Sequence, residues 1–158
     1  MLSFFQGRNE TPRLGTLRQL ALFSTLSRLE IRVVDALLHE RRYLKGEIIF
    51  DEGEEAQALY AIIAGRVLIC RQGEPDTGRI TELEAGVAFG ELALLDDRPR
   101  SAQARAAEDC VLASLSRTDF ESLLDTHAVI ASKIALQLAR QLGRQLRDRA
   151  PAVGRTTL

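Results

Sequence analysis

Residues 89–102 bring together a glycine, a carboxylate and an arginine at spacings that could bind an anion. Gly90 stands before a short helical run, 91–95, whose first amides have no partner within the helix and lie at the positive end of its dipole. Arg100 follows a rigid Arg-Pro turn and offers a planar fork of donors that matches two phosphate oxygens. Glu91 is an acceptor that suits a sugar hydroxyl. The stretch therefore predicts a site for one phosphate and one hydroxyl.

Each part of this stretch has a simpler interpretation when it is taken alone. Gly-Glu-Leu is a common tripeptide, most surface arginines are solvated, and an ion pair between Arg100 and Glu91 would merely hold a turn. These interpretations explain the parts separately and leave their assembly in one short stretch unexplained. The combination therefore favours a binding site.

The residues around this stretch have the pattern of a small β protein. From about Tyr43 onward, apolar runs are short and separated by glycines, which is typical of consecutive strands in a sandwich or barrel. Ala64-Gly65 predicts a tight hairpin turn, and the polar residues 73–78 predict a loop. The predicted strands are 46–50, 59–63, 66–70, 79–83, 102–106 and 110–115.

Helices are predicted on both sides of the strands. Ser27 and Glu30 have the spacing of a capping box, and the apolar periodicity that follows predicts a helix over 24–38. Two C-terminal helices are predicted over 116–124 and 128–149. The second of these has apolar side chains at every fourth position, namely Ile130, Ile134, Leu138, Leu142 and Leu146.

Composition excludes several classes of protein. A chain of 158 residues suits one domain, and its formal charge of −1 gives no general attraction to nucleic acid or an anionic membrane. No apolar run approaches the ~20 residues of a membrane-spanning helix and no secretory signal is evident, so we expect a cytoplasmic protein without membrane contact. Cys70 and Cys110 lie within apolar runs, while His39 and His127 are far apart, which predicts buried, reduced thiols rather than a metal site.

The assembled stretch 89–102 resembles the phosphate-binding cassette of the cyclic nucleotide-binding domain family, which includes the catabolite activator protein and protein kinase A regulatory subunits. The resemblance covers roughly 20–149. It implies a mainly β (α+β) fold, an eight-stranded jelly-roll-like β-sandwich with an N-terminal helix and two C-terminal helices. Further motifs that carry it are Lys45-Gly-Glu-Ile-Ile-Phe, Glu52-Gly-Glu and Leu59-Tyr-Ala-Ile-Ile-Ala-Gly-Arg-Val.

The resemblance also implies a division of the chain. Residues 1–19 are an N-terminal extension, 20–126 form the β-roll with its cassette, 127–149 form a C-terminal helix, and 150–158 are a flexible tail. By the resemblance, and by its apolar stripe, that helix caps the pocket and pairs with its mate in a homodimer.

The resemblance assigns roles to the cassette. It implies that Glu91 binds the ribose 2′-hydroxyl and that Arg100 pairs with the cyclic phosphate. Ser101 favours cAMP over cGMP as the ligand, and no other cofactor is implied. The implied ligand-binding residues of the cassette are Gly90, Glu91, Leu92, Arg100, Ser101 and Ala102.

The long helix adds one candidate contact. By the resemblance, Gln145 lies where a relative touches the base, and its amide could hydrogen-bond an adenine edge. An ordinary solvated helix residue is an equally good interpretation. Gly143, in the same helix, either lets a partner helix approach closely or marks a hinge, and the sequence leaves both open.

We therefore expect a receptor that senses a cyclic nucleotide and transmits binding through its C-terminal helix to an unknown effector protein. Only nine residues follow Arg149, too few for a DNA-reading helix-turn-helix, so specific DNA binding by this chain is not expected. The alternative is an interaction module that keeps the fold without binding nucleotide. An enzyme is disfavoured because no catalytic triad, metal cluster or phosphate loop ending in Gly-Lys-Ser is evident.

Overall fold

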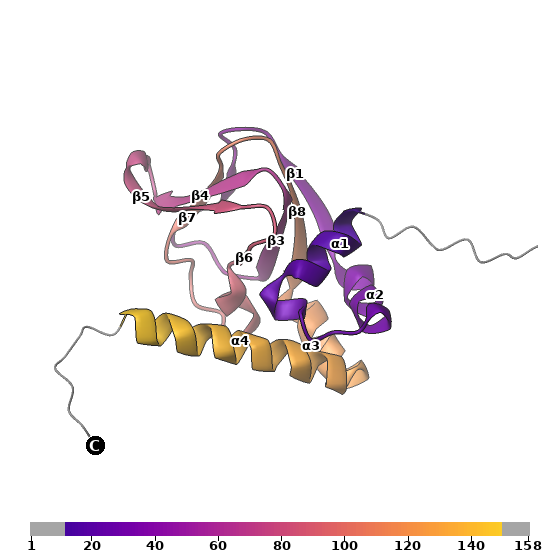
Figure 1. Cartoon of the computed structure of the whole chain (residues 1–158). Helices are drawn as coiled ribbons and strands as arrows, with labels where there is room; N and C mark the ends of the chain where they lie inside the picture. Colours follow the sequence, from indigo (N-terminus) through magenta and orange to yellow (C-terminus); the bar gives the residue numbers. More distant parts are fainter. Residues whose placement is uncertain (1–11, 150–158) are drawn as a thin grey trace, which may run out of the picture.

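Two four-stranded antiparallel sheets form the centre of the computed structural model, which describes residues 12–149 (Figure 1). The strands are β1 (His39–Tyr43), β2 (Ile48–Phe50), β3 (Ala58–Ala64), β4 (Arg66–Arg71), β5 (Glu74–Glu84), β6 (Ala88–Phe89), β7 (Gln103–Ala106) and β8 (Cys110–Ser116). One sheet has the order β1-β8-β3-β6 and the other β2-β7-β4-β5. The predicted eight-stranded, mainly β class is confirmed.

Strands β3 and β8 are buried on both faces because their sheet lies between the other sheet and the helices. Leu112 of β8 belongs to the core between the two sheets, together with Val67 and Ile62. Its neighbours Ala113 and Leu115 belong instead to the core that the helices cover. A strand covered on both sides reads as a continuous apolar run, which is why these strands stood out in the sequence.

The predicted N-terminal helix is shorter than expected, and two further helical segments precede it. Helix α2 (Arg28–Leu37) begins after Ser27. The Oγ of Ser27 accepts a hydrogen bond from the Glu30 amide at 3.2 Å, and the Ser27 amide donates one to Glu30 Oε1 at 2.9 Å. The capping box is therefore confirmed, but the extended backbone of Ser27 starts the helix four residues later than expected. Before it come a 3₁₀ turn, η1 (Ala21–Phe23), and helix α1 (Pro12–Gln19), which lies within the predicted extension.

Two C-terminal helices follow the sheets, α3 (Arg117–Thr126) and α4 (Ala128–Arg149), as predicted (Figure 1). In α4 the apolar stripe is directed largely at the chain's own core. Ile134 and Leu138 are 0% and 1% exposed and pack with α1, α2 and α3, whereas Leu146, at the other end of the stripe, is 73% exposed. The apolar periodicity predicts which face of the helix is buried, but it does not predict what that face packs against.

Three strand predictions need correction. The expected loop 73–78 falls mostly within β5, because a tight turn at Gly73, with φ of 75°, lets Glu74 pair with Arg71 of β4. Residues 75–78 form an irregularity without partners in β4 before the pairing resumes at Arg79. Strand β1 was missed because four of its five residues are exposed at an edge of the sheet, where apolar alternation is absent. The short strand β6 was missed as well. The predicted hairpin turn at Gly65 is confirmed between β3 and β4, and the predicted tail 150–158 lies outside the described residues.

An ion pair ties α4 to the N-terminal helices. Lys133 Nζ donates to Glu30 Oε1 over 2.7 Å, and the residues are separated by 103 positions in the chain. This hydrogen bond, followed by that from the Ser27 amide, lowers the pKa of Glu30 below its ordinary value. The first half of α4 is therefore fastened both by apolar burial and by charge.

We expect Lys133→Met to lower stability near neutral pH and to weaken its dependence on pH. A carboxyl whose folded-state pKa is lowered adds stability above the unfolded value of about 4.3, and this stability is lost as the pH falls through the lowered value. Since the pair is partly exposed, the difference at pH 7 is about 0.5 kcal/mol. Urea unfolding of the wild type and the variant at pH 7 and pH 3 measures the difference. If both proteins lose the same free energy of unfolding between pH 7 and pH 3, the ion pair does not make the expected contribution.

Candidate ligand-binding site

Arg100 is a buried cation with an unpaired donor. Its side chain is only 9% exposed, and its Nη2 and Nη1 donate to the carbonyl oxygens of Ala58 and Gly90 over 2.6 and 3.3 Å. Its Nε is buried and has no hydrogen-bond partner. Burial lowers the pKa of the guanidinium. Because an unpaired buried donor costs about 1–3 kcal/mol, this atom points to an acceptor that the protein itself does not supply.

Two aromatic rings contact the guanidinium, and a third ring packs against both of them. Its central carbon lies 4.1 Å from the ring centre of Phe50 and 5.9 Å from that of Tyr60. Phe89 stacks on Tyr60 with a centroid distance of 5.4 Å. Cation–π contacts of this kind strengthen when water is excluded. These rings were not predicted as part of the site, because their only signal in the sequence is their proximity to the glycine motifs.

Gly90 is required both by its backbone and by its neighbour. Its φ of 72° lies in the left-handed region, and a Cβ there would lie 2.6 Å from Arg100 Nη1. The helical run that follows is a single 3₁₀ turn, η2 (Glu91–Leu94). One such turn has little dipole, so the anion attraction that we expected from a helix terminus falls instead to Arg100.

Glu91 contacts α4 rather than Arg100. Its Oε1 accepts hydrogen bonds from Gln141 Nε2 at 3.0 Å and from Gln145 Nε2 at 3.4 Å. The ion pairs among the described residues include none between Glu91 and Arg100, so the simpler interpretation of a turn held by this pair is wrong. Gln141 was missed by the sequence analysis, although it lies one helical turn before Gln145 on the same face.

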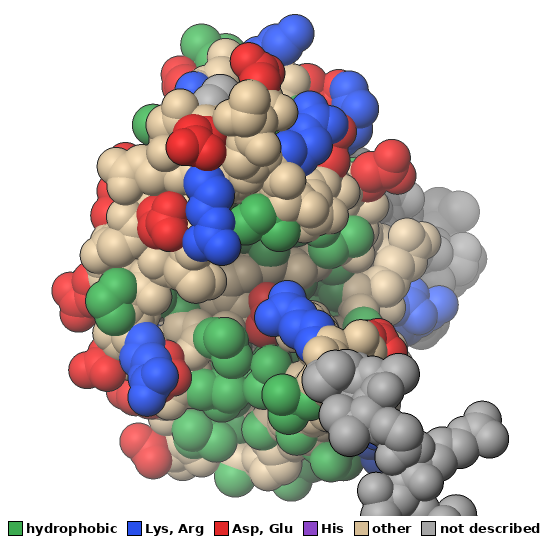
Figure 2. All heavy atoms as spheres, turned by 90° about the vertical axis from the view of Figure 1, so that its left-hand side faces the viewer, with side chains coloured by type: hydrophobic (Ala, Val, Ile, Leu, Met, Phe, Trp, Pro, Cys, Tyr) green, Lys and Arg blue, Asp and Glu red, His purple; other side chains and the backbone are tan. Residues whose placement is uncertain are grey.

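A cavity of about 390 Å³ joins these groups. Its volume is within the range of small-molecule sites, and Phe50 and Ile69 add apolar surface to its lining. Figure 2 views the side of the molecule where α4 ends and shows a hollow bordered by basic, acidic and hydrophobic side chains. All seven predicted residues line the cavity: Gly90, Glu91, Leu92, Arg100, Ser101, Ala102 and Gln145.

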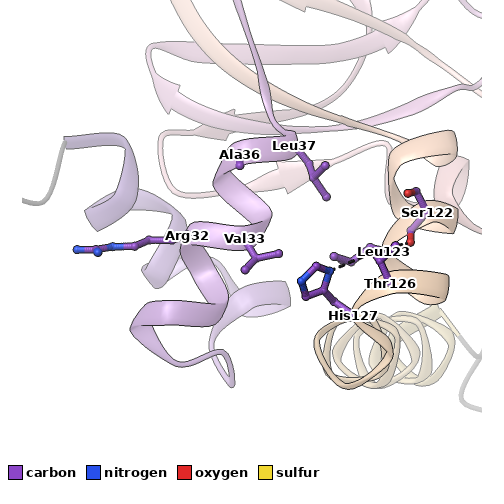
Figure 3. Close-up of a pocket in the computed structure, with 8 residues that line it drawn as sticks. All are labelled: Arg32, Val33, Ala36, Leu37, Ser122, Leu123, Thr126 and His127. Atoms are coloured by element: carbon purple, nitrogen blue, oxygen red, sulfur yellow. Dashed lines mark hydrogen bonds between the residues drawn. The ribbon is translucent and has the colours of Figure 1, made fainter.

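A larger cavity, of about 460 Å³, lies between α2 and α3 but does not suit an anion (Figure 3). Val33, Leu37 and Leu123 border it with apolar surface, and Arg32 points away from it. His127 Nδ1 is 3.0 Å from Thr126 Oγ1, so the imidazole is engaged at the end of α3. The smaller cavity is therefore the better candidate, because only it contains a buried cation.

Other chemistry finds little support in the described part of the chain. Among residues 12–149, no group of three or more His, Cys, Asp or Glu side chains could hold a metal ion. Cys70 and Cys110 are buried free thiols, as predicted, and burial raises the pKa of both. No helix within the same residues combines the length and hydrophobicity needed to cross a membrane.

Comparison with known proteins agrees with this geometry. The sequence model of the cyclic nucleotide-binding domain matches residues 40–127, more than half of the chain. The chain belongs to this family. The cyclic AMP receptor protein of Thermus thermophilus is 36% identical over 124 residues, which cover 77% of this chain and 56% of that protein.

Solved structures of the family share the fold. The catabolite activator protein of Thermus thermophilus superposes with a TM-score of 0.68 at 33% identity, covering 81% of this chain and 61% of that one. The regulatory domain of Toxoplasma gondii protein kinase A, crystallised with cAMP, gives a TM-score of 0.63 at 27% identity, covering 70% and 42%. The chain thus spans only part of the length of these relatives. The cyclic nucleotide-binding domain is what they have in common with it.

Proposed function

We propose that the chain is a receptor for a cyclic mononucleotide, with cAMP favoured over cGMP. Arg100 binds the cyclic phosphate and Glu91 binds the ribose 2′-hydroxyl. The observation that carries the proposal is the buried Arg100 with an unpaired Nε, in a cavity that also presents Glu91. A cyclic phosphate has one negative charge, which one buried guanidinium can neutralise. The printed names of two relatives, both of which refer to cyclic AMP, support the same ligand.

The remaining cavity residues suit a nucleotide in this orientation. Ser101 offers a hydroxyl next to Arg100, and the backbone of Gly90 allows close approach of the phosphate. Ile69 and Leu92 supply apolar surface for the base, and Gln145 can donate to and accept from an adenine edge. We propose no catalytic role, and buried free thiols are in keeping with a cytoplasmic protein.

Calorimetric titration of the chain with cAMP, cGMP and 5′-AMP tests the proposal. Binding of a cyclic mononucleotide in preference to 5′-AMP is the expected result, since the open phosphate carries a second charge that one arginine does not neutralise. No binding of either cyclic nucleotide would contradict the proposal. It would favour the alternative, an interaction module with an unused pocket.

We further propose that α4 passes the signal to an effector and pairs with a second copy. The apolar face available for pairing shares only Leu146 with the stripe expected from the sequence, since Ile134 and Leu138 are in the core. Val129, Leu136 and Leu146 are 67%, 51% and 73% exposed. Positions 129, 136 and 143 are one heptad apart and Leu146 follows Gly143 by three residues, so all four lie along one coiled-coil seam.

A variant with Leu136→Glu and Leu146→Glu is expected to be a folded monomer by light scattering. In a dimer the introduced carboxylates of the two chains would repel each other across the interface. In the monomer they remain in solvent, because both positions are exposed. Leu29→Glu, on α2 and 74% exposed, is the matched control and should leave the mass unchanged. A dimer that persists in the double variant would contradict pairing through α4. Leu138→Glu is unsuitable because that side chain is 1% exposed and its charge would unfold the chain.

A further inference from the structure

The carboxylate of Glu91 presents one oxygen to α4 and leaves the other available. Gln141 and Gln145 both donate to Oε1, at 3.0 and 3.4 Å, and two donors fill the two lone pairs of that oxygen. Among the hydrogen bonds of the described residues, none involves Oε2. Glu91 and both glutamines are half-buried, and Glu91 and Gln145 line the 390 Å³ cavity. The free oxygen is therefore the acceptor that a ligand can reach.

We propose that Gln141 is a positioning residue, which fixes Glu91 so that Oε2 accepts the ligand's ribose hydroxyl. The inference rests on the proposed function and adds to it a residue that itself need not touch the ligand. A glutamate side chain has several rotatable bonds and gains directional specificity only when one oxygen is held. The shorter of its two hydrogen bonds, from Gln141, supplies that restraint, and Gln145 assists more weakly at 3.4 Å.

The helix that carries Gln141 is itself well fixed just before this point. Leu138 is the last fully buried residue of α4, and Gln141 follows it by less than one turn. The backbone that carries the Gln141 amide is therefore held by the packing of the core. Gln145, a turn further out, lies closer to the end of the helix and is less constrained, in line with its longer hydrogen bond.

The neutral side-chain amide of Gln141 is also electrostatically suited to positioning Glu91. A neutral donor holds the carboxylate without cancelling its charge, so Oε2 remains a strong acceptor for a hydroxyl. A lysine or arginine at the same place would hold Glu91 as well but would pull the approaching phosphate toward itself and away from Arg100. The glutamine therefore keeps the two polar contacts of the ligand separate.

A comparison of cAMP with 2′-deoxy-cAMP tests the proposal by calorimetry. Gln141→Leu should weaken cAMP binding about tenfold, because Glu91 is then held only by Gln145 and its charge-assisted hydrogen bond to the hydroxyl is weakened. The same variant should change binding of 2′-deoxy-cAMP by less than about twofold, because that ligand has no hydroxyl to donate. Gln137→Leu is the matched control: the same substitution one turn earlier on α4, half-buried and without a contact to Glu91, should leave both affinities unchanged.

The outcomes separate the positioning role from the proposed function. Equal weakening of both ligands by Gln141→Leu would show a general loss of structure and overturn the positioning role alone. An unchanged affinity for cAMP in that variant would overturn it as well. A wild-type chain that binds neither ligand would refute the proposed function and the positioning role together. Thermal unfolding of each variant without ligand checks that all three chains are folded.

Discussion

Arg100→Leu is expected to remove most of the stabilisation of the chain by cAMP. At a ligand concentration a hundred times the dissociation constant, binding stabilises the wild type by about 2.7 kcal/mol. For a domain of this size that raises the unfolding midpoint by roughly 5–10 °C. Loss of the charge-assisted contacts should weaken binding by about 100-fold, which leaves about 0.4 kcal/mol at the same concentration. Thermal unfolding with and without cAMP measures both values.

The free protein should be little changed by the same substitution, because two effects oppose each other. Leucine removes a buried charge and its unpaired Nε, but it also removes the guanidinium donors from the carbonyl oxygens of Ala58 and Gly90, of which Gly90 still accepts the Ala93 amide. Arg98→Leu is the control, since Arg98 lines the same cavity but is exposed, and its charge is screened by solvent. A shift with cAMP that persists in Arg100→Leu and disappears in Arg98→Leu would place the phosphate elsewhere.

Gly65→Ala is expected to destabilise the chain by about 3–5 kcal/mol, a large part of the stability of a small domain. Gly65 turns the β3–β4 hairpin with a φ of 91°, and a Cβ there would clash with the carbonyl oxygen of Asp109. The obstacle is backbone held in place by β8, so it cannot rotate away as a side chain would. Urea unfolding measures the loss.

Gly73→Ala separates the two causes of that loss. Gly73 has a similar φ of 75°, but a Cβ there would meet nothing within 4 Å. Its substitution should cost only the strain of a left-handed alanine, about 1 kcal/mol. Equal losses at Gly65 and Gly73 would mean that the approach to Asp109 is relaxed at little cost.

The parts of the site that are contiguous in sequence were predictable, and the parts that depend on tertiary packing were not. Gly90, Glu91 and Arg100 occur within one stretch, and all three line the cavity as expected. The aromatic rings beside Arg100 come from β2, β3 and β6, and their convergence depends on how the two sheets face each other. Nothing local in the sequence fixes that arrangement. The roles of the cassette residues toward a ligand stay predictions.

Helix α4 illustrates the same limit within one element. Its apolar period of four predicted a helix with a hydrophobic face, and its bounds were predicted correctly. The period could not tell whether that face meets the chain's own core or a second chain. Ile134 and Leu138 turned out to be in the core, which in turn places Gln141 against Glu91. Edge strand β1 escaped prediction for a related reason, since exposed charged residues carry no apolar alternation.

The first half of α4 is fastened more firmly than the second, which gives the helix the mechanics of a lever. Lys133, Ile134 and Leu138 hold one end, so Leu138 acts as the fulcrum. Gln141 lies about 4.5 Å beyond it along the axis and Arg149 about 16 Å beyond it. A displacement of about 1 Å at the Glu91 contact would therefore become about 3–4 Å at the tip. A partner that reads the end of α4 would receive a motion several times larger than the one the ligand makes.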